Sequence, residues 1–203
     1  MAASRGSCDW RFDSGRLCLD LVATGTGTSG ACELLDGADR LAEWLVASGL
    51  VPAGTALDDV DDTWVRRFRR LRTGVDRLLT AELGGRAAAG SLERINELAA
   101  GPTPGLRAVR DGDGTLVRAL SARPDCGALL AAVARDAVEL LTDPEARAGL
   151  RRCEGDNCRR LYLDTSRGRR RRWCSSEVCG NRERVARHRR RAAAVAVPAD
   201  AGR

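Results

Sequence analysis

The chain has 203 residues, of which 43% are hydrophobic, and a formal net charge of +6 at pH 7. This length suits one hydrophobic core of about 100–150 residues with a small appended module. There is no run of about 18 apolar residues, and no apolar segment follows the N-terminal Met-Ala-Ala-Ser-Arg. We therefore expect neither a membrane span nor a secretion signal, and we predict a cytoplasmic protein with no membrane partner. Because thiols stay reduced in that compartment, the eight cysteines favour metal binding over disulfides.

The charge is divided unevenly along the chain. Residues 151–191 contain 15 Arg and 5 acidic residues, a net charge of +10, whereas residues 1–150 contain 18 Arg and 22 acidic residues, a net charge of −4. We interpret this pattern as a mildly acidic body, residues 1–150, joined to a basic module, residues 151–192. The remaining residues, 193–203, are expected to form a disordered tail.

The body is predicted to begin with a strand and a loop. The turn residues Asp13-Ser14-Gly15 precede Leu17-Cys18-Leu19-Asp20-Leu21-Val22, an apolar run of strand length, so we predict a strand over residues 17–22. Residues 25–30 are rich in Gly, Thr and Ser. The string Gly25-Thr26-Gly27 has some likeness to a phosphate-binding loop, but the spacing and the Lys of a P-loop are missing. We predict a surface loop there.

Two helices are expected next, over residues 38–48 and 59–83. In the second helix, apolar residues recur at alternating spacings of four and three, which is typical of a helix with one buried face. These residues are Trp64, Phe68, Leu71, Val75 and Leu78. The opposite face carries Arg66, Arg67, Arg69, Arg70 and Arg72. That face is either a nucleic-acid patch or, more commonly, the solvated side of a helix.

The rest of the body is predicted as a short helix capped by Ser91, a hairpin and two further helices. Strands 106–110 and 115–120 flank an Asp-Gly-Asp-Gly turn. Calcium loops also contain such a string, but position 122 is Ala where the loop needs an acidic ligand. The last two helices run from Pro124 to Leu141 and from Asp143-Pro144 towards the basic module. The predicted fold class is α+β, mainly α, with a helical N-terminal domain and a few short strands.

The basic module contains two C-x4-C pairs separated by fifteen residues. Their members are Cys153, Cys158, Cys174 and Cys179. Zinc prefers four thiolates in a tetrahedral arrangement, so these residues are predicted to bind Zn2+. His188, the one histidine, could be a ligand only by displacing a well-placed cysteine. The other cysteines, Cys8, Cys18, Cys32 and Cys126, are not clustered in the sequence, and Cys18 is expected to be buried in the core.

The elements of the module predict a small treble-clef-like zinc finger. Residues 161–164 form a strand, residues 165–168 a turn, and residues 169–173 a returning strand, after which a helix begins at Ser175 or Ser176. The expected core consists of Leu161, Leu163, Trp173, Val178 and Val185. Burial of so few side chains, at about 25 cal/mol per Å2, cannot offset the entropy of ordering the module. The metal ion must therefore stabilise the fold.

The arginines of the module are candidates for contact with nucleic acid. Asn181, Arg184, His188 and Arg191 share one helical stripe, and Asn and Arg suit bidentate contact with base edges. Asn181 could equally bond the cysteine knuckle. The full candidate set is Arg169, Arg170, Arg171, Arg172, Asn181, Arg182, Arg184, Arg187, His188, Arg189, Arg190 and Arg191. Alternatively, these arginines only solvate the module or bind acidic protein or RNA.

Two regions of the chain carry a family resemblance. The module is similar to the CGNR zinc finger through Cys153-x4-Cys158-x2-Leu161-Tyr162-Leu163-Asp164-Thr165-Ser166, Arg171-Arg172-Trp173-Cys174-Ser175 and Cys179-Gly180-Asn181-Arg182. Gly15-Arg16-Leu17-Cys18-Leu19-Asp20, followed by Glu33-Leu34-Leu35, resembles the ABATE domain. The resemblance implies a bacterial stress-induced transcription regulator with four Cys ligands and a DNA-binding finger. It also implies that residues 1–150 serve regulation or dimerisation.

The sequence thus predicts a transcription regulator that binds double-stranded DNA through an Arg-rich helix. Homodimerisation and a small-molecule effector are further expectations for the body. The alternatives are an RNA- or ribosome-associated zinc protein, and a zinc-bearing redox or interaction module. We do not expect an enzyme, because four thiolate ligands leave no open metal position for water.

Overall fold

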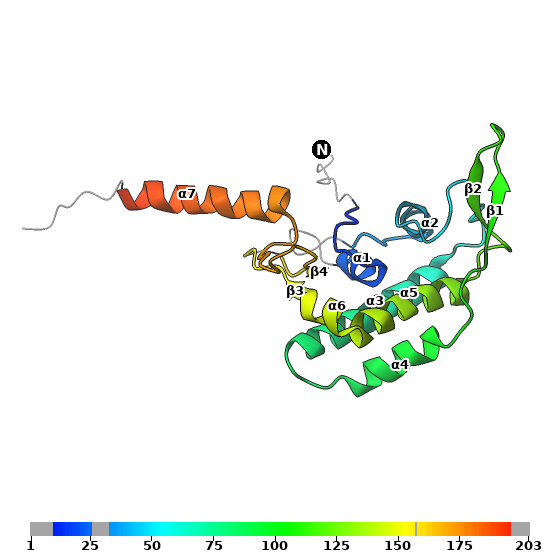
Figure 1. Ribbon diagram of the computed structural model, residues 1–203, viewed down its shortest axis with the longest axis horizontal. Coiled ribbons are helices and arrows are strands. Elements are labelled where there is room, and N and C mark those ends of the chain that lie inside the picture. Colours follow the sequence, from blue (N-terminus) through cyan, green and yellow to red (C-terminus); the bar gives the residue numbers. More distant parts are fainter. Residues whose placement is uncertain (1–9, 26–32, 157, 196–203) are drawn as a thin grey trace, which may run out of the picture.

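The computed structural model describes residues 10–25, 33–156 and 158–195, and it is mainly helical (Figure 1). The elements in chain order are α1 (Leu17–Ala23), α2 (Ala38–Ala47), α3 (Asp62–Leu83), α4 (Ala89–Ala99), β1 (Leu106–Arg110), β2 (Leu116–Leu120), α5 (Cys126–Thr142), α6 (Pro144–Gly149), β3 (Leu150–Arg152), β4 (Leu161–Leu163), a π-helical turn (Ser176–Gly180) and α7 (Asn181–Val195). The α+β, mainly α fold class is therefore confirmed. None of the helices in the described segments is long and apolar enough to cross a membrane.

The core lies between the long helices α3 and α5, with α1, α2 and α4 packed around them (Figure 1). The predicted apolar stripe of α3 is buried, except that Trp64 is only partly buried while its neighbour Val65 is fully packed. Asp61 caps α3 by accepting hydrogen bonds from the amides of Thr63 and Trp64, and Asp125 caps α5 in the same way. The helices predicted over residues 38–48, 59–83 and 124–141 are confirmed.

Two predictions in the body are wrong. Residues 17–22, predicted as a strand, belong to helix α1, which buries Cys18, Leu19, Leu21 and Val22. Short apolar runs do not distinguish a buried strand from a buried helix. Here the carboxylate of Asp136, in α5, accepts the Cys18 amide at 2.8 Å and caps the helix from outside. Ser91 does not cap α4 either, since the helix begins earlier, after Ala88.

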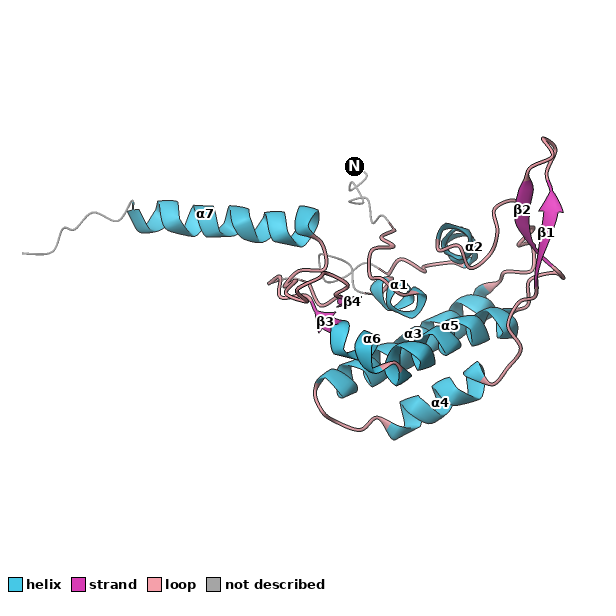
Figure 2. Cartoon of the chain, in the orientation of Figure 1, coloured by secondary structure: helices cyan, strands magenta, loops and turns pink. Residues whose placement is uncertain are grey.

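The first sheet is the predicted hairpin of β1 and β2. Its strands are antiparallel, with Leu106 opposite Leu120 and Arg110 opposite Leu116. The Asp111 carboxylate accepts hydrogen bonds from the amides of Asp113 and Thr115, which closes the turn. The acidic string therefore serves a turn, as predicted. Figure 2 shows the hairpin standing away from the helices.

The second sheet corrects the predicted hairpin of the basic module. Strand β4 pairs with β3, with Leu150 opposite Leu163, and not with residues 169–173. Residues 169–173 are held by other contacts, because the buried Asp164 carboxylate accepts the Arg171 amide at 2.9 Å. Both Leu150 and Leu161 join the hydrophobic core of the body. The small sheet therefore fixes the basic module to the helices.

Several expectations fall at the limits of the described residues. Helix α7 continues to Val195, three residues into the segment expected to be a tail, and residues 196–203 lie outside the described ranges. Cys8, Cys32 and most of the predicted loop over residues 25–30 also lie outside them. Cys18 is fully buried, as expected, although it lies on a helix.

Candidate metal centre and nucleic-acid interface

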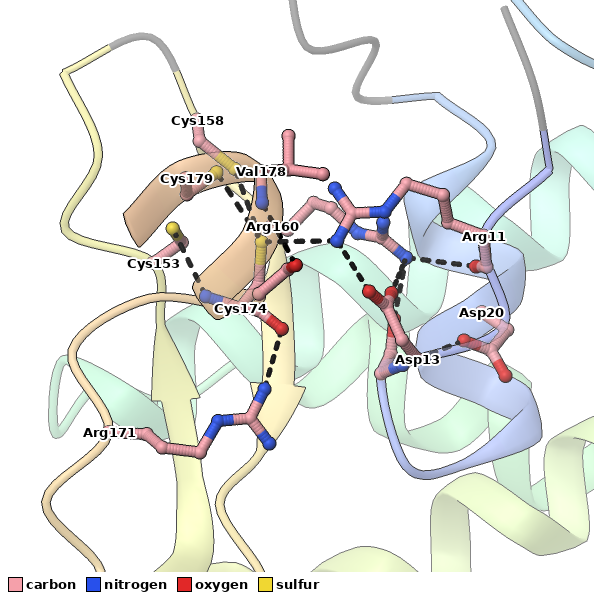
Figure 3. A network of polar contacts seen from close by, with 12 residues as sticks. Arg11, Asp13, Asp20, Cys153, Cys158, Arg160, Arg171, Cys174, Val178 and Cys179 are labelled. Atoms are coloured by element: carbon pink, nitrogen blue, oxygen red, sulfur yellow. Dashed lines mark hydrogen bonds and ion pairs between the residues drawn. The ribbon is translucent and has the colours of Figure 1, made fainter. Parts of the chain in front are cut away.

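The four predicted cysteine ligands come together in one buried cluster (Figure 3). Their sulfur atoms all lie within 4.8 Å of one another. The Cys158–Cys174 and Cys174–Cys179 sulfur separations are 3.8 and 3.7 Å. These separations are too long for a disulfide, and all four thiols are free. A tetrahedron with Zn–S bonds of about 2.3 Å has edges of about 3.8 Å. The cluster therefore fits one tetrahedral metal ion.

Backbone contacts hold each cysteine pair in a tight turn. In the first pair, the amide of Cys158 donates to the Gly155 carbonyl, and the amide of Cys153 donates to the Arg160 carbonyl, both at 2.9 Å. In the second pair, the Ser175 hydroxyl accepts the Val178 amide at 3.2 Å and caps the π-helical turn that carries Cys179. This cap confirms the predicted role of Ser175.

The pairs are also linked to each other through sulfur. The Cys174 amide donates to the Cys153 sulfur at 3.3 Å. Such N–H···S contacts orient thiolates and stabilise their charge in metal sites. The two pairs thus form one preorganised ligand set, although they are distant in the sequence.

The crowding of four sulfurs separates their pKa values. Hydrogen bonds from Cys158 and Cys174 lower the pKa of the Cys153 thiol. The contact with Cys153 raises the pKa of Cys158 to about 11, and burial raises the pKa of Cys179 to about 11. The contacts with Cys153 and Cys158 raise the pKa of Cys174 as well. A bound cation would favour the thiolates and release the thiol protons.

The apolar core of the finger is smaller than predicted. Tyr162 is fully buried against the cysteines, and Trp173 packs beside it. Val178 and Val185, which were expected to face a hairpin, are exposed by 38% and 43%. This part of the prediction is wrong because the finger buries its leucines against the body and not against its own helix.

A buried arginine joins the finger to the body (Figure 3). Arg160, only 3% exposed, donates to the Arg11 carbonyl at 3.0 Å and to the Ser14 hydroxyl at 2.9 Å. It also lies 3.2 Å from the Asp13 carboxylate. The Arg11 guanidinium in turn lies 4.0 Å from the Cys174 sulfur. The N-terminal segment therefore reaches from α1 to the cysteine cluster.

The ABATE-like string Gly15-Arg16-Leu17-Cys18-Leu19-Asp20 has a structural explanation at this junction. Gly15 has a φ of +89°, and a Cβ there would lie 3.1 Å from the Cβ of Leu163 in β4. Arg16 pairs with Asp136 at 2.9 Å, which ties the start of α1 to α5. The Leu163 amide donates to the Ser14 carbonyl at 2.8 Å. The string therefore forms the surface of the body against which the finger packs.

Asp20 also belongs to this contact surface. Its carboxylate accepts the Ser14 amide at 3.1 Å. Burial raises the pKa of Asp20 to about 6, although the contact with Ser14 and the nearby Arg160 favour the ionised form. The junction between body and finger thus contains a carboxyl group whose protonation changes near neutral pH.

The arginines predicted for nucleic acid fall into two groups. Those before the second cysteine pair are largely engaged within the protein. Arg171 donates to the Cys174 carbonyl at 2.6 Å and lies over the Tyr162 ring, and Arg172 pairs with Glu154 at 2.6 Å. Arg169 lies 3.9 Å from the Glu145 carboxylate. Arg171 is therefore primarily a structural residue of the finger.

The second group lies on α7, which extends away from the body (Figure 1). Asn181 and Arg184 lie in its first turns, and Arg184 approaches the Ser176 carbonyl at 3.5 Å. Glu183, 15% exposed, faces back towards the Asp156 amide and also lies near Arg190. Four exposed residues have side chains that make no hydrogen bond or ion pair with any residue in the described part of the chain. They are Arg187, His188, Arg189 and Arg191.

Sequence reasoning missed the residues of the junction. Arg160 is one of fifteen arginines in the module and has no pattern that marks it as buried. Asp13 and Ser14 were assigned only to a turn. Asp164 and Tyr162 were noted in the family string, but their contacts to the Arg171 backbone were not foreseen. For Arg160, Asp13 and Ser14 the partners lie in distant segments, so the signal is not local, whereas the contacts of Asp164 and Tyr162 with Arg171 span only seven and nine residues.

The structure thus defines a helical body that carries a four-cysteine metal-binding finger with a basic helix. Two family models match the chain: ABATE, "Putative stress-induced transcription regulator", over residues 15–144, and the CGNR zinc finger over residues 150–192. The chain therefore belongs to the ABATE family and contains a CGNR zinc finger. No curated protein matches it.

Proposed function

We propose that this protein is a zinc-dependent transcription regulator that binds double-stranded DNA through α7. The observation that supports this function best is an exposed, arginine-rich helix that begins directly after a metal ligand, Cys179. Arginines attract DNA phosphates without regard to sequence, and a helix is the element that enters the major groove. The family description agrees with regulation of transcription.

Zinc is the metal that fits the cluster best. Four thiolates at tetrahedral spacing are typical of structural zinc, and they fill every ligand position. A closed shell of this kind supports a structural and not a catalytic role. Purified protein should contain one zinc per chain by elemental analysis. The double variant Cys153→Ser/Cys174→Ser should lose it, and stoichiometric zinc in that variant would contradict the ligand assignment.

The positions of the polar residues on α7 suggest that some contact bases and others contact phosphates. Asn181 and Arg184 lie next to the metal-anchored turn, so their backbone is held firmly and they are suited to base contact. Arg187, Arg189 and Arg191 lie farther along the exposed helix and are suited to phosphate contact. Arg184→Ala should therefore cost about 1–3 kcal/mol on a specific site. On random DNA the same change should cost only the effect of one charge.

The phosphate contacts can be tested by the salt dependence of binding to duplex DNA. With about five phosphate contacts, affinity should fall with salt at a log–log slope of about −4 to −5. Arg187→Gln/Arg191→Gln should reduce the slope by up to about two units. The matched control is Arg107→Gln/Arg147→Gln, which removes two exposed arginines of the body. Binding that is insensitive to salt, or an equal effect in the control, would contradict the role of α7. Tighter binding to RNA than to DNA would favour the RNA alternative.

The role of Asn181 requires a separate measurement, because it follows the metal turn directly. Full zinc content with lost sequence preference in Asn181→Ala would indicate base readout. Loss of zinc in the same variant would instead assign Asn181 to the architecture of the cysteine knuckle.

A further inference from the structure

A groove lies between α3 and the start of α4, with a volume of about 660 Å3. Its lining contains four arginines, Arg69, Arg70, Arg77 and Arg94, and no acidic residue. A volume of this order is typical of sites for small ligands. The groove is formed entirely by the body and is separate from the finger.

Two of the four arginines of the groove have no acidic partner among the described residues. Arg70 and Arg77 are exposed, and neither side chain makes a hydrogen bond or ion pair within the described residues. Arg94 is 71% exposed and pairs only weakly with Glu97, at 3.2 Å in its own helix. Arg69 bonds the Leu35 carbonyl through its Nε, which holds its side chain in place, and it lies 3.6 Å from the Glu33 carboxylate, which compensates part of its charge. With two unpaired arginines and two that are only partly compensated, the groove keeps a net positive charge, which favours an anion between the side chains.

The start of α4 adds backbone donors to the same groove. Ala88, the N-cap residue, has no side chain that can accept a hydrogen bond, so the first amides of the 11-residue helix are uncapped. Ala89, Gly90 and Ser91 line the groove at this end. The positive end of a helix dipole favours a negative charge at this point. The helix end and the arginines therefore act on the same space.

The lining of the groove includes a glycine that close packing does not explain. Gly74 lies in the middle of α3, where glycine costs about 0.5–1 kcal/mol relative to alanine. A Cβ at this position would meet no atom of the described residues within 4 Å. Packing therefore does not explain the glycine. A side chain there would project into the groove, so Gly74 leaves room for a ligand.

We propose that this groove binds a small molecule carrying a phosphate or polyphosphate group. Guanidinium groups bind phosphate oxygens through two parallel hydrogen bonds, and several arginines together suit a multiply charged group. A concave site of limited volume fits a small ligand better than a nucleic-acid strand. In Figure 1, α4 lies at the lower edge of the body, away from α7. The inference does not depend on DNA binding by α7.

The test is isothermal titration calorimetry of the full, zinc-loaded chain with inorganic phosphate, pyrophosphate and ATP. The variant Arg70→Gln/Arg77→Gln removes the two unpaired arginines, and Arg107→Gln/Arg147→Gln is the charge-matched control. We expect the first variant to weaken pyrophosphate or ATP binding at least about tenfold, because each charge-assisted bond contributes strongly, and the control to bind as the parent does. Comparison of the three anions separates recognition of the phosphate group alone from recognition of a nucleotide.

A second variant tests the groove in case the first variant loses binding because it misfolds. Gly74→Leu keeps every charge, should not lower helix stability, and should block the groove. It should therefore unfold no earlier than the parent while losing the ligand. Failure of the parent to bind any of the three anions would overturn the proposal, as would equal binding by the groove variants and the control. Loss of duplex-DNA affinity in the groove variants, without anion binding by the parent, would assign the groove to nucleic acid and overturn it too.

Discussion

Replacement of Arg160 should separate the finger from the body. Arg160→Met keeps the length of the side chain but removes its donors. Three acceptors then lose a partner: the Arg11 carbonyl, the Ser14 hydroxyl and the Asp13 carboxylate. A buried acceptor without a partner costs about 1–3 kcal/mol, and loss of one member of a buried ion pair costs about 3–5 kcal/mol.

The expected loss of unfolding free energy lies at the lower end of the range for a broken buried ion pair. Asp13 is 41% exposed, so water can solvate its carboxylate in the variant. In addition, the Nε of Arg160 is buried with no hydrogen-bond partner among the described residues, a cost that Met removes. We expect the free energy of unfolding to fall by about 3 kcal/mol, which for a chain of this size corresponds to about 6–12 °C in Tm.

The measurements are thermal unfolding and hydrogen exchange of the zinc-loaded chain. Arg159→Met is the matched control, because Arg159 is the exposed neighbour in the same segment. Amides at the junction, above all Leu163, which donates to the Ser14 carbonyl, should exchange faster only in Arg160→Met. If Arg160→Met unfolds like the control and keeps this protection, the junction does not depend on Arg160.

Three further results are expected. Asp20→Asn should become more stable than the parent as the pH rises from about 4 to about 6. The folded-state pKa of Asp20, about 6, exceeds the ordinary value of 3.8, so ionisation of this carboxyl group destabilises the folded parent. The gain in the free energy of unfolding should plateau near 1–2 kcal/mol after allowance for solvent screening. A constant difference across that pH range would contradict this account. Gly15→Ala should cost more than the roughly 1–2 kcal/mol of a positive φ, because of the Leu163 contact, whereas Gly54→Ala, with φ +78° and no close neighbour, should cost only that amount. Cys174→Ser should lower the Tm of the helical body as well as the zinc content, and an unchanged Tm would show that the finger is independent.

The last of these expectations differs from the prediction that sequence alone supports. A basic module of about forty residues with its own cysteines has the appearance of a separate domain. In the structure, however, Leu150 and Leu161 of the small sheet belong to the core of the body. The charge boundary near residue 150 is real, but the packing boundary does not coincide with it.

The metal ligands were predictable because their signal is local and chemical. Each C-x4-C pair is a short turn with two sulfurs, and the spacing alone predicts that the pairs can share an ion. The long helices were predictable for a similar reason, since the apolar stripe of α3 repeats over several turns. Patterns that repeat, or that involve an uncommon residue type, can be interpreted without knowledge of the tertiary structure.

The predictions that were wrong, or that were not made, concern features without a repeating pattern or an uncommon residue type. The string at residues 17–22 could be a strand or a helix, and the choice is made by Asp136, more than a hundred residues later. The partner of β4 is β3 because Asp164 holds the following segment in another path. Arg160 is buried by an N-terminal segment that has no pattern of its own. The first and last of these outcomes depend on contacts between segments far apart in the sequence. The second depends on a choice between two neighbouring segments, and periodicity and propensity encode neither.

The same reasoning limits what α7 can do. No side chain among its residues 181–192 is buried, and its described packing is against the π-helical turn that carries Cys179. Arg187 and Arg191 are four residues apart on one face, and like charges at that spacing destabilise an isolated helix. A helix of 15 residues with such repulsion gains little from its own sequence. The helix is therefore anchored mainly at the end next to the cysteine cluster. If α7 contacts DNA as proposed, we expect sequence discrimination in the turns next to that end, where the backbone is held.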